Sequence, residues 1–89
     1  MQKVEKITES SGPNFIFCSM NNNHIFVHNQ NGTIVCNISV PVSGGTLVGV
    51  DTDSTGAYIC ATASNHKVYV FKRTSPTGYN WSLTRIYGI

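Results

Sequence analysis

Charged residues are scarce in this chain of 89 residues. Asp, Glu, Lys and Arg make up 11% of it, against roughly 25% in an average soluble domain. The few basic residues are scattered, so no run of Lys and Arg forms a phosphate-binding face, and no nucleic-acid partner is predicted. The chain also lacks an apolar run of the roughly 18 residues that a membrane-spanning helix needs, so no membrane partner is predicted.

Residues that favour helices are few as well. Glu, Lys, Leu and Ala are largely replaced by Asn, Ser, Thr and Gly, a composition typical of β-rich proteins with many turns. Hydrophobic residues nevertheless make up 40% of the chain, which is enough for a globular core. The length allows a single small structural unit whose independent stability is marginal.

The three cysteines do not form a recognisable framework. Their number is odd and no C-x-x-C pair is present among Cys18, Cys36 and Cys60, so neither a disulfide network nor a zinc site is predicted. Each lies in an apolar segment, where a free thiol packs as a small hydrophobic group. We expect reduced, buried thiols in a reducing compartment, which favours the cytoplasm without identifying it.

An internal repeat organises the chain. Equivalent residues are separated by 42 to 44 positions, and repeats of about 40–45 residues with four strands each are typical of β-propellers. The repeat divides the chain into residues 1–43 and 44–89, two blades within one structural unit. The residue pairs are Gly12 and Gly56, Cys18 and Cys60, His24 and His66, and Ile25 and Val68.

Eight short segments rich in β-branched and aromatic residues predict four strands in each repeat. The predicted strands are Val4–Glu9, Asn14–Met20, His24–His28, Thr33–Val40, Leu47–Thr52, Ala57–Ala63, Lys67–Arg73 and Trp81–Tyr87. Turns are expected at residues 11–13 and 74–78, and Asn31-Gly32 is a signal for a two-residue hairpin. The second strand of each repeat is apolar on both faces, so it must be covered on both sides.

The second repeat resembles a blade of the WD-repeat or FG-GAP propeller families. The resemblance is carried by Asp51–Ala61, then by Lys67–Phe71 and Trp81–Leu83. It covers residues 46–88 well and residues 3–41 more loosely. The Gly-His pair at the start of a WD blade and the Trp-Asp pair after its third strand are absent, so both families stay open. The resemblance implies an all-β fold of two four-stranded antiparallel blades that need further blades to complete a ring.

One motif offers oxygen ligands. Asp51, Asp53 and Thr55 precede Gly56 in a pattern like the opening of a calcium loop. The same pattern is expected of a simple turn between two strands, and we favour the turn. With four carboxylates in the chain and no nucleophile or nucleotide motif, we expect no catalytic residues, no resident metal and no cofactor.

Candidate binding residues gather in the second repeat. Arg73, Tyr79, Trp81 and Arg85 are of the types that anchor protein interfaces or stack on sugars. The alternative is that they pack the fourth strand against a neighbouring blade, and we favour packing.

Two functions fit these observations. Two blades cannot close a ring that typically has four to eight, so we expect other copies or other protein chains to cover the remaining apolar surface. The first hypothesis is a non-catalytic binding or scaffold module that mediates protein–protein contacts or assembly. The alternative is an oligomeric, lectin-like propeller that binds a glycan between blades, near Tyr79, Trp81 and Arg85.

Overall fold

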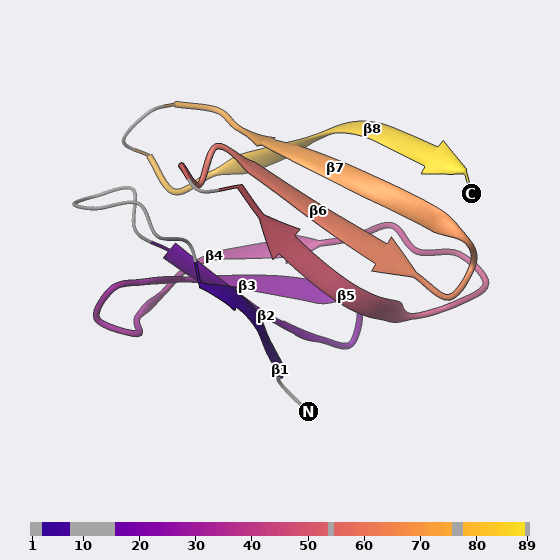
Figure 1. The fold of residues 1–89 in the computed structure, drawn as a ribbon, viewed down its shortest axis with the longest axis horizontal. Coiled ribbons are helices and arrows are strands. Elements are labelled where there is room, and N and C mark those ends of the chain that lie inside the picture. The colour runs from indigo at the N-terminus through magenta and orange to yellow at the C-terminus, as the bar shows by residue number, and fades with distance from the viewer. Residues whose placement is uncertain (1–2, 8–15, 54, 76–77, 89) are drawn as a thin grey trace.

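The computed structural model describes residues 3–7, 16–53, 55–75 and 78–88, which form two stacked antiparallel sheets (Figure 1). Strand order is β1-β2-β3-β4 in sheet 1 and β5-β6-β7-β8 in sheet 2, so strands that follow one another along the chain are paired. No described residue is helical, and within this part of the chain no helix could cross a membrane. The strands are β1 Lys3–Ile7, β2 Ile16–Asn21, β3 His24–Asn29, β4 Ile34–Ser39, β5 Leu47–Thr52, β6 Tyr58–Ala63, β7 Lys67–Arg73 and β8 Trp81–Gly88.

The predicted all-β class is confirmed, and each predicted strand overlaps an observed one. The turn predicted at residues 11–13 lies outside the described residues, as do the predicted strand ends at Glu9 and Asn14. The predicted turn at 74–78 is described only in part. The predicted division between Ser43 and Gly44 falls in the linker between β4 and β5, residues 40–46.

The hairpin loop between the second and third strands is one residue longer in sheet 2. In sheet 1, Asn22 and Asn23 form a two-residue loop with positive φ angles of 51° and 63°. This conformation suits a twisted hairpin, and Asn tolerates it well. In sheet 2 the loop spans residues 64–66, with His66 at φ 65°. The extra residue explains why the spacing of equivalent residues changes within the repeat.

The prediction of a two-residue hairpin at Asn31-Gly32 is wrong. A backbone hydrogen bond of 2.9 Å joins Asn29 to Thr33, so the loop has three residues, 30–32. The Asn29 side-chain oxygen accepts bonds from the backbone N–H groups of Asn31 and Thr33, both at 3.0 Å. Gly32 closes the loop at φ 84°. The dipeptide located the turn, but the side chain of Asn29 stabilises the wider loop.

A shared irregularity fixes which residues of the two sheets are equivalent. The pairing of the third strand with the fourth is interrupted after Val27 in sheet 1 and after Val70 in sheet 2. On the other side of the third strand, Val27 pairs with Cys18 and Val70 pairs with Cys60. The backbone register therefore makes Val27 equivalent to Val70, and Cys18 equivalent to Cys60.

This register defines two faces in each sheet, because successive side chains of a strand point to opposite sides. We call the face that carries Cys18 or Cys60 the front face, and the opposite one the back face. The front face comprises Ile16, Cys18, Met20, Ile25, Val27, Cys36 and Ile38 in sheet 1, and, in the same order, Tyr58, Cys60, Thr62, Val68, Val70, Arg85 and Tyr87 in sheet 2. The back face includes Ser19, Phe26, His28, Ile34 and Asn37 in sheet 1, and, in the same order, Ala61, Tyr69, Phe71, Leu83 and Ile86 in sheet 2.

The hydrophobic core lies between the front face of sheet 1 and the back face of sheet 2. β5 lies against β1 and β2, so the first strands of the two sheets come close together. The two sheets lie one over the other (Figure 1), and the front face of sheet 1 packs on the back face of sheet 2. The core residues are Ile16, Cys18, Ile25, Val27, Ile38, Val40, Val50, Ile59, Ala61, Ala63, Tyr69, Phe71 and Trp81.

Two hairpin loops hold the linker in place. Asn23, in the β2–β3 loop, donates from Nδ2 to the Gly45 carbonyl at 3.4 Å and accepts from the Leu47 backbone N–H at 2.9 Å. Asn65, in the β6–β7 loop, donates from Nδ2 to the Ser43 carbonyl at 3.0 Å. A Cβ atom on Gly45 would lie 2.6 Å from the Ser64 hydroxyl oxygen, so the linker can pass this close only as glycine.

We predict that Asn23→Gly lowers the free energy of unfolding by about 1–2 kcal/mol. Glycine keeps the positive φ angle but removes two side-chain hydrogen bonds, each worth about 1 kcal/mol. Asn22→Gly is the matched control, because Asn22 has a similar φ angle and is exposed; we expect a change within about 0.5 kcal/mol. Urea unfolding of both variants measures this, and equal losses would contradict the assigned role of Asn23.

Candidate functional site

The front face of sheet 2 points away from sheet 1. Tyr58 and Tyr87 are 42% and 50% exposed, and Cys60, Val68 and Val70 between them are half-buried. The residues at the equivalent positions of sheet 1 belong to the core, and all of Ile16, Cys18, Ile25 and Val27 are 0% exposed. Equivalent positions differ in burial because sheet 1 has sheet 2 on its front, whereas no described element lies on the front of sheet 2.

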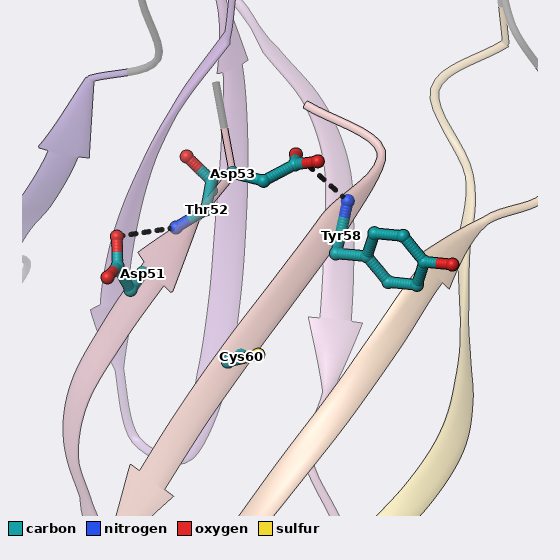
Figure 2. Close-up of a pocket in the computed structure, with 5 residues that line it drawn as sticks. All are labelled: Asp51, Thr52, Asp53, Tyr58 and Cys60. Carbon is teal, nitrogen blue, oxygen red and sulfur yellow. Dashed lines mark hydrogen bonds between the residues drawn. The ribbon is translucent and has the colours of Figure 1, made fainter. Parts of the chain in front are cut away.

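An open pocket of about 250 Å³ lies on this face, where β5 ends and β6 begins. The ammonium of Lys72 lies 6.0 Å from the centre of the Tyr58 ring, within range of a cation–π contact. The pocket thus combines an aromatic ring with acidic side chains, and the Lys72 ammonium lies nearby. The lining residues are Asp51, Thr52, Asp53, Tyr58 and Cys60 (Figure 2).

The oxygens of the calcium-like motif are bonded within their own turn (Figure 2). Asp51 accepts from the backbone N–H of Thr52 at 2.8 Å. Asp53 accepts from the backbone N–H of Tyr58 at 3.2 Å through Oδ1, and from the Thr55 hydroxyl at 2.8 Å through Oδ2. These hydrogen bonds are typical of a turn shaped by Asp and Thr side chains. Among the described residues, no group of three or more His, Cys, Asp and Glu side chains is placed to hold a metal ion.

Three of the four predicted binding residues come together, at the end of β7 and the start of β8. The Arg73 guanidinium lies 4.8 Å from the centre of the Trp81 ring and 5.3 Å from that of Tyr79. Arg73 also donates from Nε to the Gly78 carbonyl at 2.6 Å. Trp81 is 7% exposed and donates from Nε1 to the Gly56 carbonyl at 3.1 Å. Arg73 and Trp81 are therefore packed into the sheet, whereas Tyr79 stays half-buried.

Arg85 lies apart from this cluster. It pairs with Val70 on the front face of sheet 2, whereas Arg73 and Trp81 belong to the back face. Its side chain is exposed. The two arginines therefore have different environments: burial lowers the pKa of Arg73, an effect opposed by Tyr79, although an arginine remains charged at neutral pH. Arg85 contributes its charge to the free face.

Sequence reasoning missed a polar pair on the back face of sheet 1. The Ser19 hydroxyl lies 3.0 Å from His28 Nε2, and His28 Nδ1 lies 3.2 Å from the Gly32 carbonyl. A carbonyl only accepts, so the ring donates from Nδ1 to Gly32, and Nε2 bonds to the Ser19 hydroxyl. Ser19 and His28 are 2% and 9% exposed. The sequence offered no signal for this pair, because the register of the β2–β3 hairpin decides whether the two side chains share a face.

The three thiols are free and protonated at neutral pH. Burial, with smaller effects of Cys36 and Asp51, raises the pKa of Cys18 to about 12. Burial also raises the pKa values of Cys36 and Cys60, which are only half-buried. A protonated thiol is a weak nucleophile and metal ligand, so these groups act here as small apolar side chains.

Comparison of the chain with known protein families, with curated proteins and with solved structures finds no match.

We predict that Arg73→Lys lowers the free energy of unfolding by about 1–3 kcal/mol. Lysine lacks the planar guanidinium that stacks on two rings and bonds to the Gly78 carbonyl, so the exchange is not conservative at this site. Arg85→Lys is the matched control, and we expect a change within about 0.5 kcal/mol at this exposed position. Thermal and urea unfolding test both variants. Equal stability of the two would show that the stacked cluster contributes nothing to the fold.

We predict that Cys18 makes stability fall as the pH rises above about 9. Its pKa is about 9.0 when exposed and about 12 in the fold, so the unfolded chain loses this proton first and ionisation favours unfolding. The contribution of Cys18 to stability should fall by about 2 kcal/mol between pH 8 and pH 10.5. Urea unfolding with a reductant present measures wild type and Cys18→Ala at both pH values. The stability difference between the two proteins should shrink; a constant difference would contradict the raised pKa.

Proposed function

We propose that this chain is a non-catalytic β-propeller module that works through protein–protein contact, with sheets 1 and 2 acting as two blades. The observation that carries the proposal is the front-on-back stacking of two equivalent sheets. Such stacking uses two different faces for one interface. The interface between the two sheets therefore uses neither the front face of sheet 2 nor the back face of sheet 1, on which Ile34 is 48% exposed and Phe26 is half-buried.

This arrangement differs from that of a closed sandwich. When two sheets pack through the same face, the apolar surface is used up and no equivalent interface remains. Stacking in one direction is a heterologous contact, which continues until the units close a ring or form a filament. Propellers are rings of four to eight such four-stranded sheets. The repeat length and the approach of β5 to β1 and β2 both support the propeller interpretation.

The chemistry of the free face supports contact with protein. Tyr and Arg are enriched in interfaces, and the cores of interfaces are depleted of charge. The front face of sheet 2 has Val68 and Val70 at its centre, with Tyr58, Arg85 and Tyr87 around them. The carboxylates of Asp51 and Asp53 are hydrogen-bonded within their own turn.

We predict that a photo-crosslinking amino acid in place of Val70 yields a discrete protein adduct when the chain is illuminated in the cells that produce it. The same amino acid in place of Asn31, an exposed loop residue, should yield none. Mass spectrometry identifies the adduct, and either a second copy or another protein supports the proposal. Val68→Asp should abolish the adduct because it places a charge in the middle of the face.

Ile86→Asp is the control for that substitution. Ile86 is 49% exposed but belongs to the back face of sheet 2, so the adduct should persist. No adduct at position 70, or equal labelling at positions 70 and 31, would contradict a role in protein contact.

A further inference from the structure

We propose that the partner of the free front face is the back face of sheet 1 in a second copy of this chain, docked as sheet 1 docks on sheet 2. The proposal rests on the function proposed above and names its partner. The template is the interface within the chain, where a front face already covers a back face. A second copy supplies the back face of its sheet 1, which is equivalent in register to the back face of sheet 2 that is buried within the chain.

The front face of sheet 2 is equivalent, position by position, to a face that already packs. Val70 lies where sheet 1 has Val27, and Val68 lies where it has Ile25. Both valines keep the β-branched shape that packs well on a pleated surface. Cys60 lies where sheet 1 has Cys18. The centre of the face thus repeats the shape of the packed one in apolar residues of similar size.

The back face of sheet 1 is equivalent to the face that sheet 2 buries. Phe26 lies at the position of Tyr69, and His28 at the position of Phe71. Ser19 lies at the position of Ala61, so a small residue is retained at the centre of the face, where a close approach of two sheets requires one. The polar atoms of Ser19 and His28 already have partners on their own sheet, so a docked sheet could cover them without leaving a donor unpaired.

The free faces are more polar than the pair that forms the core. Tyr58, Thr62 and Arg85 stand on the front of sheet 2 where sheet 1 has Ile16, Met20 and Cys36. A single chain can expose such a face to water and still bury it on association, because a non-obligate interface as a whole is about as apolar as the rest of a protein surface. Association between copies is therefore expected to be reversible and to depend on concentration, unlike packing within the chain.

Head-to-tail docking can be tested with two variants that each block one face. Val70→Asp blocks the front face of sheet 2, and Phe26→Asp blocks the back face of sheet 1. Each variant alone should sediment with the mass of one chain. An equimolar mixture should form a dimer of one copy of each, because each variant retains the face that the other has lost. Wild type should form larger species. Ile86→Asp should behave like wild type, because it changes neither the front face of sheet 2 nor the back face of sheet 1.

Other outcomes overturn the proposal. Self-association of Phe26→Asp would show front-to-front packing, self-association of Val70→Asp would show back-to-back packing, and a mixture that stays at the single-chain mass would exclude head-to-tail docking. Circular dichroism checks that each variant folds; if one does not, Tyr87→Asp and Ile34→Asp block the same two faces at positions that are 50% and 48% exposed. Wild type that remains a single chain, with crosslinks at position 70 to another protein, would overturn this inference while the proposed function stands.

Discussion

Contact between two unlike faces is the interaction on which this structure depends. The front face of sheet 1 is almost wholly apolar, and it covers the aromatic and small residues on the back of sheet 2. A bare apolar face is unfavourable in water, so each sheet is stabilised by covering the other. Because the two sheets are equivalent in register and stack in one direction, covering the front face of sheet 1 leaves the front face of sheet 2 exposed. The buried core and the exposed front face of sheet 2 therefore both result from this stacking in one direction.

The strands could be predicted from the sequence because they depend on local patterns. Alternating β-branched residues and turn-forming Asn and Gly located all eight strands within a few positions. The spacing of Cys18 and Cys60 gave the equivalence that the backbone register later supported. The size of the loop at Asn31-Gly32 was missed because it depends on Asn29, whose bonds to the backbone stabilise three loop residues.

The candidate site was harder to predict because burial depends on what lies opposite a strand. Phe15–Cys18 and Tyr58–Ala61 have the same apolar character in the sequence, yet at equivalent positions Ile16 is 0% exposed and Tyr58 is 42% exposed. Arg73 and Arg85 were grouped because they lie in neighbouring strands. The face on which each side chain lies depends on the irregular pairing between β7 and β8. The regular alternation of side chains along a strand does not reveal such an irregularity. The pairing of Ser19 with His28 likewise needs the register of a hairpin.

The linker held by Asn23 and Asn65 affects whether sheet 1 packs on sheet 2 of its own chain or of a neighbouring chain. Sheet 1 could in principle cover sheet 2 of its own chain or that of a neighbour, and exchange of this kind is domain swapping. A linker of only seven residues between the two sheets keeps the chain's own partner at a high effective concentration, which for short connections is on the order of millimolar. At ordinary concentrations the pairing within one chain should therefore form before any pairing between chains.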